Sequence, residues 1–168
     1  MPSWSAKGAG GAQIRENVVS FRNSANEGKR LVTRSVGDVL ILVQNNDSPT
    51  DLEWQECLRM LKEIREQHRR VRVLVVTEGG GPDGRQRKKL EQALSGGPVP
   101  VAVVSDSLKM RFISAGVALF NQGHRAFQSS EVEAAYEHLG LTRSERRQVE
   151  EAINQTWPLI DTKKPSWR

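Results

Sequence analysis

Ser105, Asp106 and Ser107 stand together after an apolar run, and a serine beside an acid is a candidate nucleophile. Nucleophilic catalysis also needs a general base within hydrogen-bonding reach. His124 and His138 follow later in the chain, but the sequence brings neither of them to the serines. Ser and Asp before an apolar helix are typical N-cap residues, because their oxygens accept hydrogen bonds from the free amides. We therefore predict a helix N-cap here.

A second candidate is the loop TEGGGPDG at 77–84, between an apolar run and a basic helical segment. Backbone amides in such a position can bind an anion. The loop matches neither the dinucleotide motif G-x-G-x-x-G nor the triphosphate loop that ends in Lys-Ser/Thr, and Pro82 lacks an amide donor. A plain connection between a strand and a helix also explains the glycines. Nucleotide binding stays an alternative.

Other reactive side chains are few. Cys57 is the one cysteine, which excludes an internal disulfide, and the three histidines lie in separate segments without zinc-ligand spacing. Asp47 ends the run QNND after an apolar stretch, so it lacks the paired acid of a phospho-accepting receiver domain. We therefore predict a protein that is not an enzyme and carries neither a metal nor a cofactor.

The composition predicts one folded domain. The chain has 168 residues, of which 37% are hydrophobic and 27% charged. No stretch approaches the roughly 20 apolar residues of a membrane span, and the first residues lack the apolar core of a secretory signal. These features predict a cytoplasmic protein without membrane insertion. The net charge is +5, but basic residues alternate with acidic ones along the helices, which argues against a nucleic-acid surface.

Hydrophobic periodicity predicts strands that alternate with helices. Strands are expected at 17–21, at 31–43 with a break near Gly37, and at 71–76, 99–104 and 125–127. Helices are expected at 51–70, 85–94, 108–120, 131–139 and 144–155, and the helix at 108–120 is expected to be the most buried. Capping boxes are predicted at Thr50–Glu53, Ser130–Glu133 and Thr142–Glu145. This order predicts an α/β fold with a mixed, mostly parallel sheet of four to five strands.

Three segments in this order resemble the STAS domain, named for sulphate transporters and anti-sigma-factor antagonists. They are DVLILV at 38–43, VRVLVVT at 71–77 and VAVVSDS at 101–107, each followed by a loop and a helix. The stretch RFISAGVALF at 111–120 and the ending YEHLGL at 136–141 are similar to bacterial STAS-like proteins. The resemblance covers residues 16–141. It leaves 1–15 as a flexible lead-in, 142–157 as an appended helix and 158–168 as a flexible tail.

The resemblance implies a docking surface for another protein. Anti-sigma-factor antagonists bind their partner near the loop after the third strand, where an Asp-Ser-Ser-Gly-like motif carries a phosphorylated serine. This chain departs from that motif, since Thr77 is the only hydroxyl residue in the loop and belongs to the strand end. What carries over is the surface, made of Thr77, Glu78, Gly79, Gly80, Gly81, Asp83, Gly84, Arg85, Arg87, Lys88 and Lys89.

Two neighbouring loops should lie beside that surface, because the carboxyl ends of parallel strands meet at one edge of the sheet. They supply Asn45, Asn46, Asp47, Ser105, Asp106 and Ser107. We expect a non-catalytic regulatory protein-binding module, whose basic helix suits a partner with an acidic face. The alternative is a domain that binds a small molecule, either a nucleotide or a lipid. The sequence leaves open whether the chain forms a homodimer.

Overall fold

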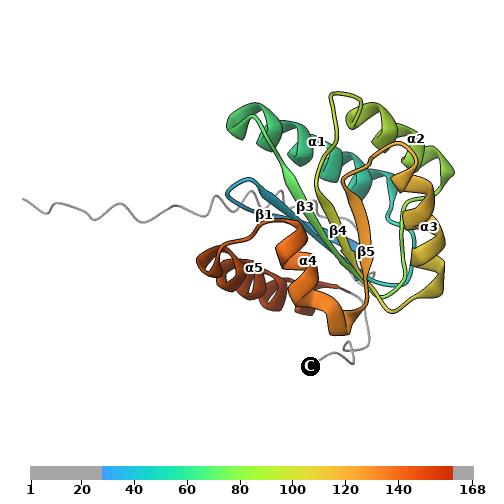
Figure 1. Ribbon diagram of the computed structural model, residues 1–168. Coiled ribbons are helices and arrows are strands. Elements are labelled where there is room, and N and C mark those ends of the chain that lie inside the picture. The colour runs from blue at the N-terminus through green and yellow to red at the C-terminus, as the bar shows by residue number, and fades with distance from the viewer. Residues whose placement is uncertain (1–27, 161–168) are drawn as a thin grey trace, which may run out of the picture.

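The computed structural model describes residues 28–160, and the strand expected at 17–21 lies outside them (Figure 1). Its strands are β1 (Leu31–Val36), β2 (Val39–Gln44), β3 (Arg72–Thr77), β4 (Val101–Val104) and β5 (His124–Phe127). Its α-helices are α1 (Asp51–His68), α2 (Gly84–Ala93), α3 (Leu108–Ala118), α4 (Val132–His138) and α5 (Arg143–Thr156). Two 3₁₀ turns, η1 (Ser129–Glu131) and η2 (Trp157–Leu159), flank the last two helices.

The five strands form one sheet in the order β1-β2-β3-β4-β5. The pair β1–β2 is antiparallel, and the other three pairs are parallel. The predicted α/β class and the mixed, mostly parallel sheet are therefore confirmed. Because each strand lies beside the next one in sequence, the loops that follow β2, β3 and β4 are neighbours at one end of the sheet.

The segment at 31–43 was predicted as one broken strand, and the structure differs from this prediction. It forms two strands joined by a tight turn, in which Gly37 has φ 56° and Val36 pairs with Val39. That backbone conformation is accessible to glycine and reverses the chain within two residues. The break expected at Gly37 is thus a hairpin turn.

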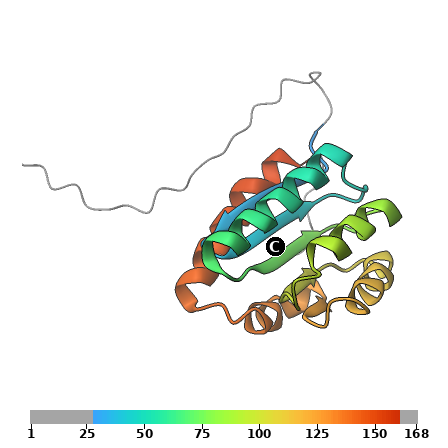
Figure 2. The same cartoon turned by 90° about the horizontal axis from the view of Figure 1, so that it is seen from above.

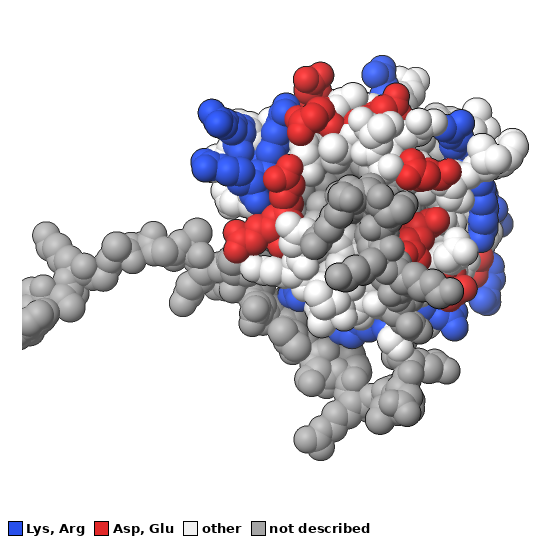
Figure 3. Space-filling model, turned by 90° about the horizontal axis from the view of Figure 1, so that it is seen from below, with Lys and Arg blue, Asp and Glu red and all other residues white. Residues whose placement is uncertain are grey.

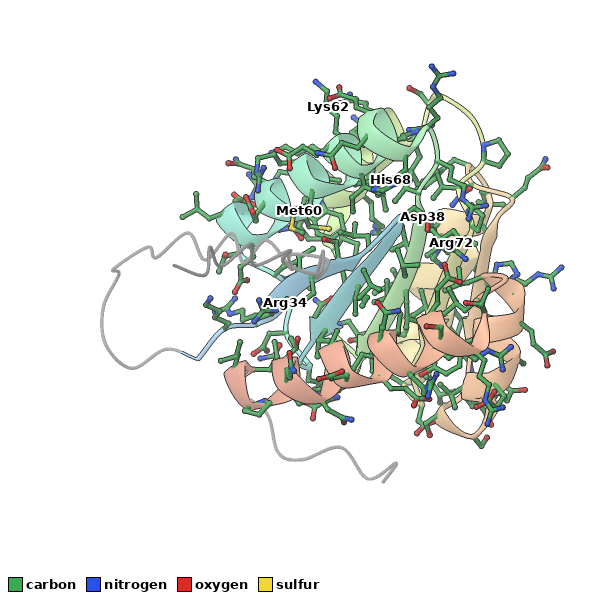
Figure 4. The ribbon with its side chains drawn as sticks, turned by 90° about the vertical axis from the view of Figure 1, so that its left-hand side faces the viewer. Arg34, Asp38, Met60, Lys62, His68 and Arg72 are labelled. Atoms are coloured by element: carbon green, nitrogen blue, oxygen red, sulfur yellow. The ribbon has the colours of Figure 1, made fainter. Side chains whose placement is uncertain are left out.

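Helices cover both faces of the sheet. The crossovers through α1, α2 and α3 all advance in the same direction along the sheet, so these helices lie in a row on one face (Figure 2). Helices α4 and α5 cover the other face, and the sheet is seen between α1 and α5 in Figure 4. Side chains that alternate along the strands therefore enter two separate cores.

The two cores explain why β2, β3 and β4 read as continuous apolar runs. Ile41, for example, packs toward α4 and α5, while its neighbour Leu42 packs toward α1. Trp54 and Cys57, on α1, are buried in the second core. Helix α5, which the sequence division leaves outside the STAS-like part, supplies Val149 and Ile153 to the first core.

A charged network closes the end of the sheet opposite the three loops. The guanidinium of Arg72, at the start of β3, donates to both carboxylate oxygens of Asp38, over 2.5 and 3.2 Å. It also donates to Glu145 over 2.7 Å and to the carbonyl oxygens of Leu139 and Gly140. Figure 4 shows Asp38 and Arg72 side by side. The network joins the β1–β2 hairpin to the start of α5.

The helix starts follow the predicted capping chemistry at two of three places. Thr50 with Glu53 and Thr142 with Glu145 form capping boxes, as predicted. The box predicted at Ser130 is wrong, because Gln128 and Glu131 make it two residues earlier, at η1. None of the helices in residues 28–160 combines the length and the apolar composition that a membrane span needs.

Candidate functional site

The three loops after β2, β3 and β4 pack against one another. The amide of Gly80 donates to the carbonyl oxygen of Asn45 over 2.9 Å. A Cβ added at Gly79, where φ is 146°, would lie 2.5 Å from Oδ1 of Asn46 and 2.9 Å from Oγ of Ser107. The glycine loop is thus held between the other two loops, and its buried glycines allow the close approach.

The hydroxyl group of Thr77 organises this loop from inside. Thr77 is the last residue of β3, as expected, and it is buried. Its Oγ1 donates to the carbonyl oxygen of Gly80 over 2.7 Å and accepts from the amide of Gly79 over 3.1 Å. The hydroxyl group of Thr77 is therefore buried and bonded to backbone groups of its own loop.

The amides of the loop are already in use inside the protein. Glu78 donates its amide to the carbonyl oxygen of Gln44, and the amides of Gly79 and Gly80 have the partners given above. The start of α2 is closed as well, since the carboxylate of Asp83 accepts from the amide of Gln86 over 2.9 Å. These contacts leave no free row of amides at 78–80 for a phosphate group, which weighs against the nucleotide alternative.

Ser105, Asp106 and Ser107 reach the expected edge but do not cap α3 with their side chains. Ser107 is the N-cap residue, and within the described part of the chain it makes no side-chain cap hydrogen bond. Ser105 Oγ accepts from the amide of Ser107, and Asp106 accepts from the amide and hydroxyl of Ser129 over 3.0 and 2.6 Å. The N-cap prediction is wrong in this respect, because Asp106 holds the η1 turn instead.

Neither histidine accompanies these serines. His124 pairs in register with Val101, four residues before Ser105, which corresponds to about 13 Å along the strand. His138 lies at the same end as His124, where its Nε2 is 2.8 Å from the carbonyl oxygen of Gly123. In residues 28–160, no histidine is thus placed to serve as a base for Ser105 or Ser107.

Helix α3 is the main departure from the sequence reading. It was expected to be the most buried helix, yet only Met110, Ser114 and Val117 are buried. Phe112 is 80% exposed, and Leu108 and Leu119 are 68% and 89% exposed. The helix is apolar on two sides, and the sheet covers only one of them. The prediction assumed that a helix with apolar residues on every side is enclosed by protein. It is wrong because one apolar side of α3 faces away from the core.

The exposed apolar residues form a stripe. Leu108 and Phe112 are four residues apart on α3, and Leu119, the C-cap residue in helical conformation, follows seven residues later, so the three lie on one side. We call these three residues the α3 stripe. Exposed apolar groups that lie together, rather than singly, are typical of binding surfaces.

A groove runs beside the stripe, between α3 and the end of the glycine loop. Its volume is ≈ 570 Å³, and the surface exposed in it is mainly apolar. Phe112 belongs to both the stripe and the groove. The lining residues are Ser48, Gly81, Pro82, Asp83, Arg87, Lys109, Phe112 and Ile113. The predicted loop and the start of α2 thus form one wall, and α3 forms the other.

Positive charge borders the groove. Within residues 28–160, none of the basic residues Arg87, Lys88, Lys89 and Lys109 forms an ion pair, while Arg85 lies 3.9 Å from Asp51. Asp83 is occupied as the N-cap of α2. Figure 3 views the end at which the parallel strands finish, and Lys and Arg line its right-hand margin, the side of α3 in Figure 1.

The described residues contain no group of three or more His, Cys, Asp or Glu side chains that could hold a metal ion. Cys57 is enclosed in the second core, where burial raises the pKa of its thiol to about 12.

Comparisons of the chain with protein-family models, curated proteins and solved structures find no match.

Sequence reasoning found one wall of the groove and missed the other. It named Asp83, Arg87 and the glycine loop, but it assigned the apolar residues of α3 to the core. The signal was present in the spacing: Met110 and Val117 mark one stripe, while Leu108, Phe112 and Leu119 mark a second. When a helix covers only one face of a sheet, two apolar stripes on different sides of that helix indicate one side for the core and another for a partner.

Proposed function

We propose that this protein is a non-catalytic regulatory module that acts in the cytoplasm by binding another protein through the groove and the α3 stripe. The proposal keeps the function suggested by the STAS resemblance and moves the centre of its docking surface. Gly79 and Gly80 are buried behind that surface. The contact residues are therefore those of α3, the end of the loop at Gly81 and Pro82, and the first turns of α2.

One observation carries the proposal: the α3 stripe exposes large apolar side chains on a regular helix, beside a groove. The exposure of Leu and Phe side chains to water is unfavourable, by about 25 cal/mol for each Å² of apolar surface. A partner that covers them recovers that free energy. Aromatic side chains at the centre of such a surface commonly contribute most to binding.

The experiment is quantitative copurification of the tagged protein from its native host cells. Phe112→Glu places a charge in the centre of the surface and should remove the specific partner. Leu159→Glu is the matched control, since Leu159 is also exposed, at 44%, but lies in η2, which follows α5. Both variants should show the same circular dichroism and melting temperature as the unaltered protein.

The partner must then bind the protein again when both are purified, with the same dependence on Phe112. Equal recovery with Phe112→Glu and with the unaltered protein contradicts the proposal. A partner lost equally with Leu159→Glu places the surface elsewhere and contradicts it as well.

A second candidate function is the binding of a small amphiphilic anion, such as a fatty acid or a nucleotide. It is favoured by the position of Arg87 and Lys109 in an otherwise apolar groove. A ligand at about 100 times its dissociation constant stabilises a protein by roughly 2.7 kcal/mol. A panel of fatty acids and nucleotides that leaves the melting temperature unchanged contradicts this second function.

A further inference from the structure

Resting on the proposed function, we infer the chemistry of the partner: an amphipathic helix that lies along the α3 stripe and carries acidic residues toward Arg87 and Lys109. The length, the shape and the charge of this face each favour such a partner.

The length of the stripe favours a helix over a small ligand. Leu108 and Leu119 are eleven residues apart, which corresponds to about 16 Å along the axis of a helix. The stripe extends beyond the groove, since only Phe112 belongs to both. A partner helix of three or more turns covers this length, and its apolar residues at every third or fourth position meet the stripe.

The shape of the site favours a protein over a membrane or a nucleic acid. Phe112 and Ile113 form one wall of a concave groove, and Pro82 and Gly81 form the other. A bilayer surface is flat on this scale and does not fill a groove. A nucleic-acid backbone offers no apolar face to Leu108 and Leu119, which are aliphatic.

The charge around the site selects an acidic partner. Arg87 and Lys109 line the groove, and neither forms an ion pair within the part of the chain that the structure describes. Carboxylates on the flank of a bound helix would face these two cations. Such complementarity raises the rate of association and discriminates between partners.

The same charges argue against a second copy of this chain. In a two-fold dimer the same surface lies on both subunits, so each charge near the axis meets a like charge. The segment 107–130 contains Lys109, Arg111 and Arg125 and no acidic residue. Two copies joined through α3 would therefore bring cations together.

The partner chemistry can be read without knowing the partner, by selecting a displayed library of helix-forming peptides against the unaltered protein. Counter-selection against Phe112→Glu removes peptides that bind elsewhere. We expect enriched sequences with apolar residues spaced by three or four, and more Asp and Glu than Lys and Arg. A synthetic peptide from this pool should bind Lys109→Glu about tenfold or more weakly, and Leu159→Glu with unchanged affinity.

Enrichment of basic or non-helical sequences overturns the inference, and so does a pool in which Asp and Glu are not in excess. Either result leaves the docking surface itself intact. An empty selection overturns it too. Sedimentation with vesicles that contain about 30% anionic lipid tests a membrane as the occupant, and gel filtration tests a second copy of the chain. Vesicle binding lost with Phe112→Glu, or a dimer lost with it, contradicts a helical protein partner.

Discussion

At the scale of the residue, His124 is a buried titratable group whose pKa is lowered in the folded protein. Within residues 28–160 neither of its ring nitrogens has a hydrogen-bond partner, and both are buried. Burial lowers the pKa of His124 to about 4, and the charge of His138 acts in the same direction. In the unfolded chain a histidine titrates near 6.5. The unfolded state therefore binds the proton first as the pH falls, and the folded state loses stability.

This depressed pKa predicts that stability is complete above about pH 6.5 and falls as the pH approaches 4. Between pH 7.5 and pH 5 the free energy of unfolding should decrease by about 2 kcal/mol, measured by urea unfolding at each pH. In the variant His124→Asn most of this decrease should disappear. A variant that keeps the full decrease assigns the pH dependence to other groups.

A second residue-scale prediction concerns the glycine loop. A Cβ at Gly80 would collide with the backbone oxygens of Asn45 and Asp47, whereas the nearest atom to a Cβ at Gly84 is Nη2 of Arg87 at 3.9 Å. Gly80→Ala should therefore destabilise the protein by about 2 kcal/mol or more. Gly84→Ala, in the first turn of α2, should be neutral or stabilising by up to about 1 kcal/mol. Equal unfolding midpoints for the two variants would show that the loops are not packed as described.

At the scale of the element, sequence patterns predicted the strands well and the exposure of the helices less well. The runs at 39–43, 73–76 and 101–104 are continuous and apolar because helices cover both faces, so the pattern and the environment agree. The exposure of α3 did not follow from its composition, since an apolar residue contributes equally to the pattern whether it meets the core or a partner. Gly37 was ambiguous for a related reason: a glycine in an apolar run fits a bulge or a turn.

Helix α3 offers a direct stability contrast between its two faces. Phe112→Ala should change the free energy of unfolding by no more than about 0.5 kcal/mol, because Phe112 is exposed. Met110→Ala should cost about 2–5 kcal/mol, because Met110 is buried in the second core. Chemical unfolding of both variants measures this contrast. A large loss with Phe112→Ala would mean that Phe112 belongs to the core and not to a docking surface.

At the scale of the whole molecule, the Arg72 network ties elements that are far apart in sequence. Arg72 and Asp38 are almost fully buried, and the loss of Arg72 leaves Asp38 with only the exposed Arg70 as a partner and removes the ion pair of Glu145. Arg72→Met should therefore cost about 3–5 kcal/mol in unfolding experiments. Arg59→Met is the control: Arg59 pairs with Glu56 and Glu63 on the exposed side of α1, and its loss should cost less than about 1 kcal/mol. Similar costs would argue against the role given to the network.

This organisation places the Arg72 network and the proposed docking surface at opposite ends of the sheet. The Asp38–Arg72 end of the sheet joins the hairpin to α5, while the opposite end gathers the three loops behind the groove. The sequence predicted that the three loops would meet, because strand ends in a parallel sheet are neighbours. It did not predict that their glycines and hydroxyls would be consumed in packing, because that depends on contacts between segments some 30 residues apart.

The most direct test of the docking surface is site-specific photo-crosslinking in the native host cells. Phe112 is replaced by the photoreactive benzoylphenylalanine, and Leu159 is replaced in a parallel experiment. We predict one defined protein adduct from position 112, lost when Lys109→Glu is added, and no such adduct from position 159. No adduct from position 112, or the same adducts from both positions, would contradict the account.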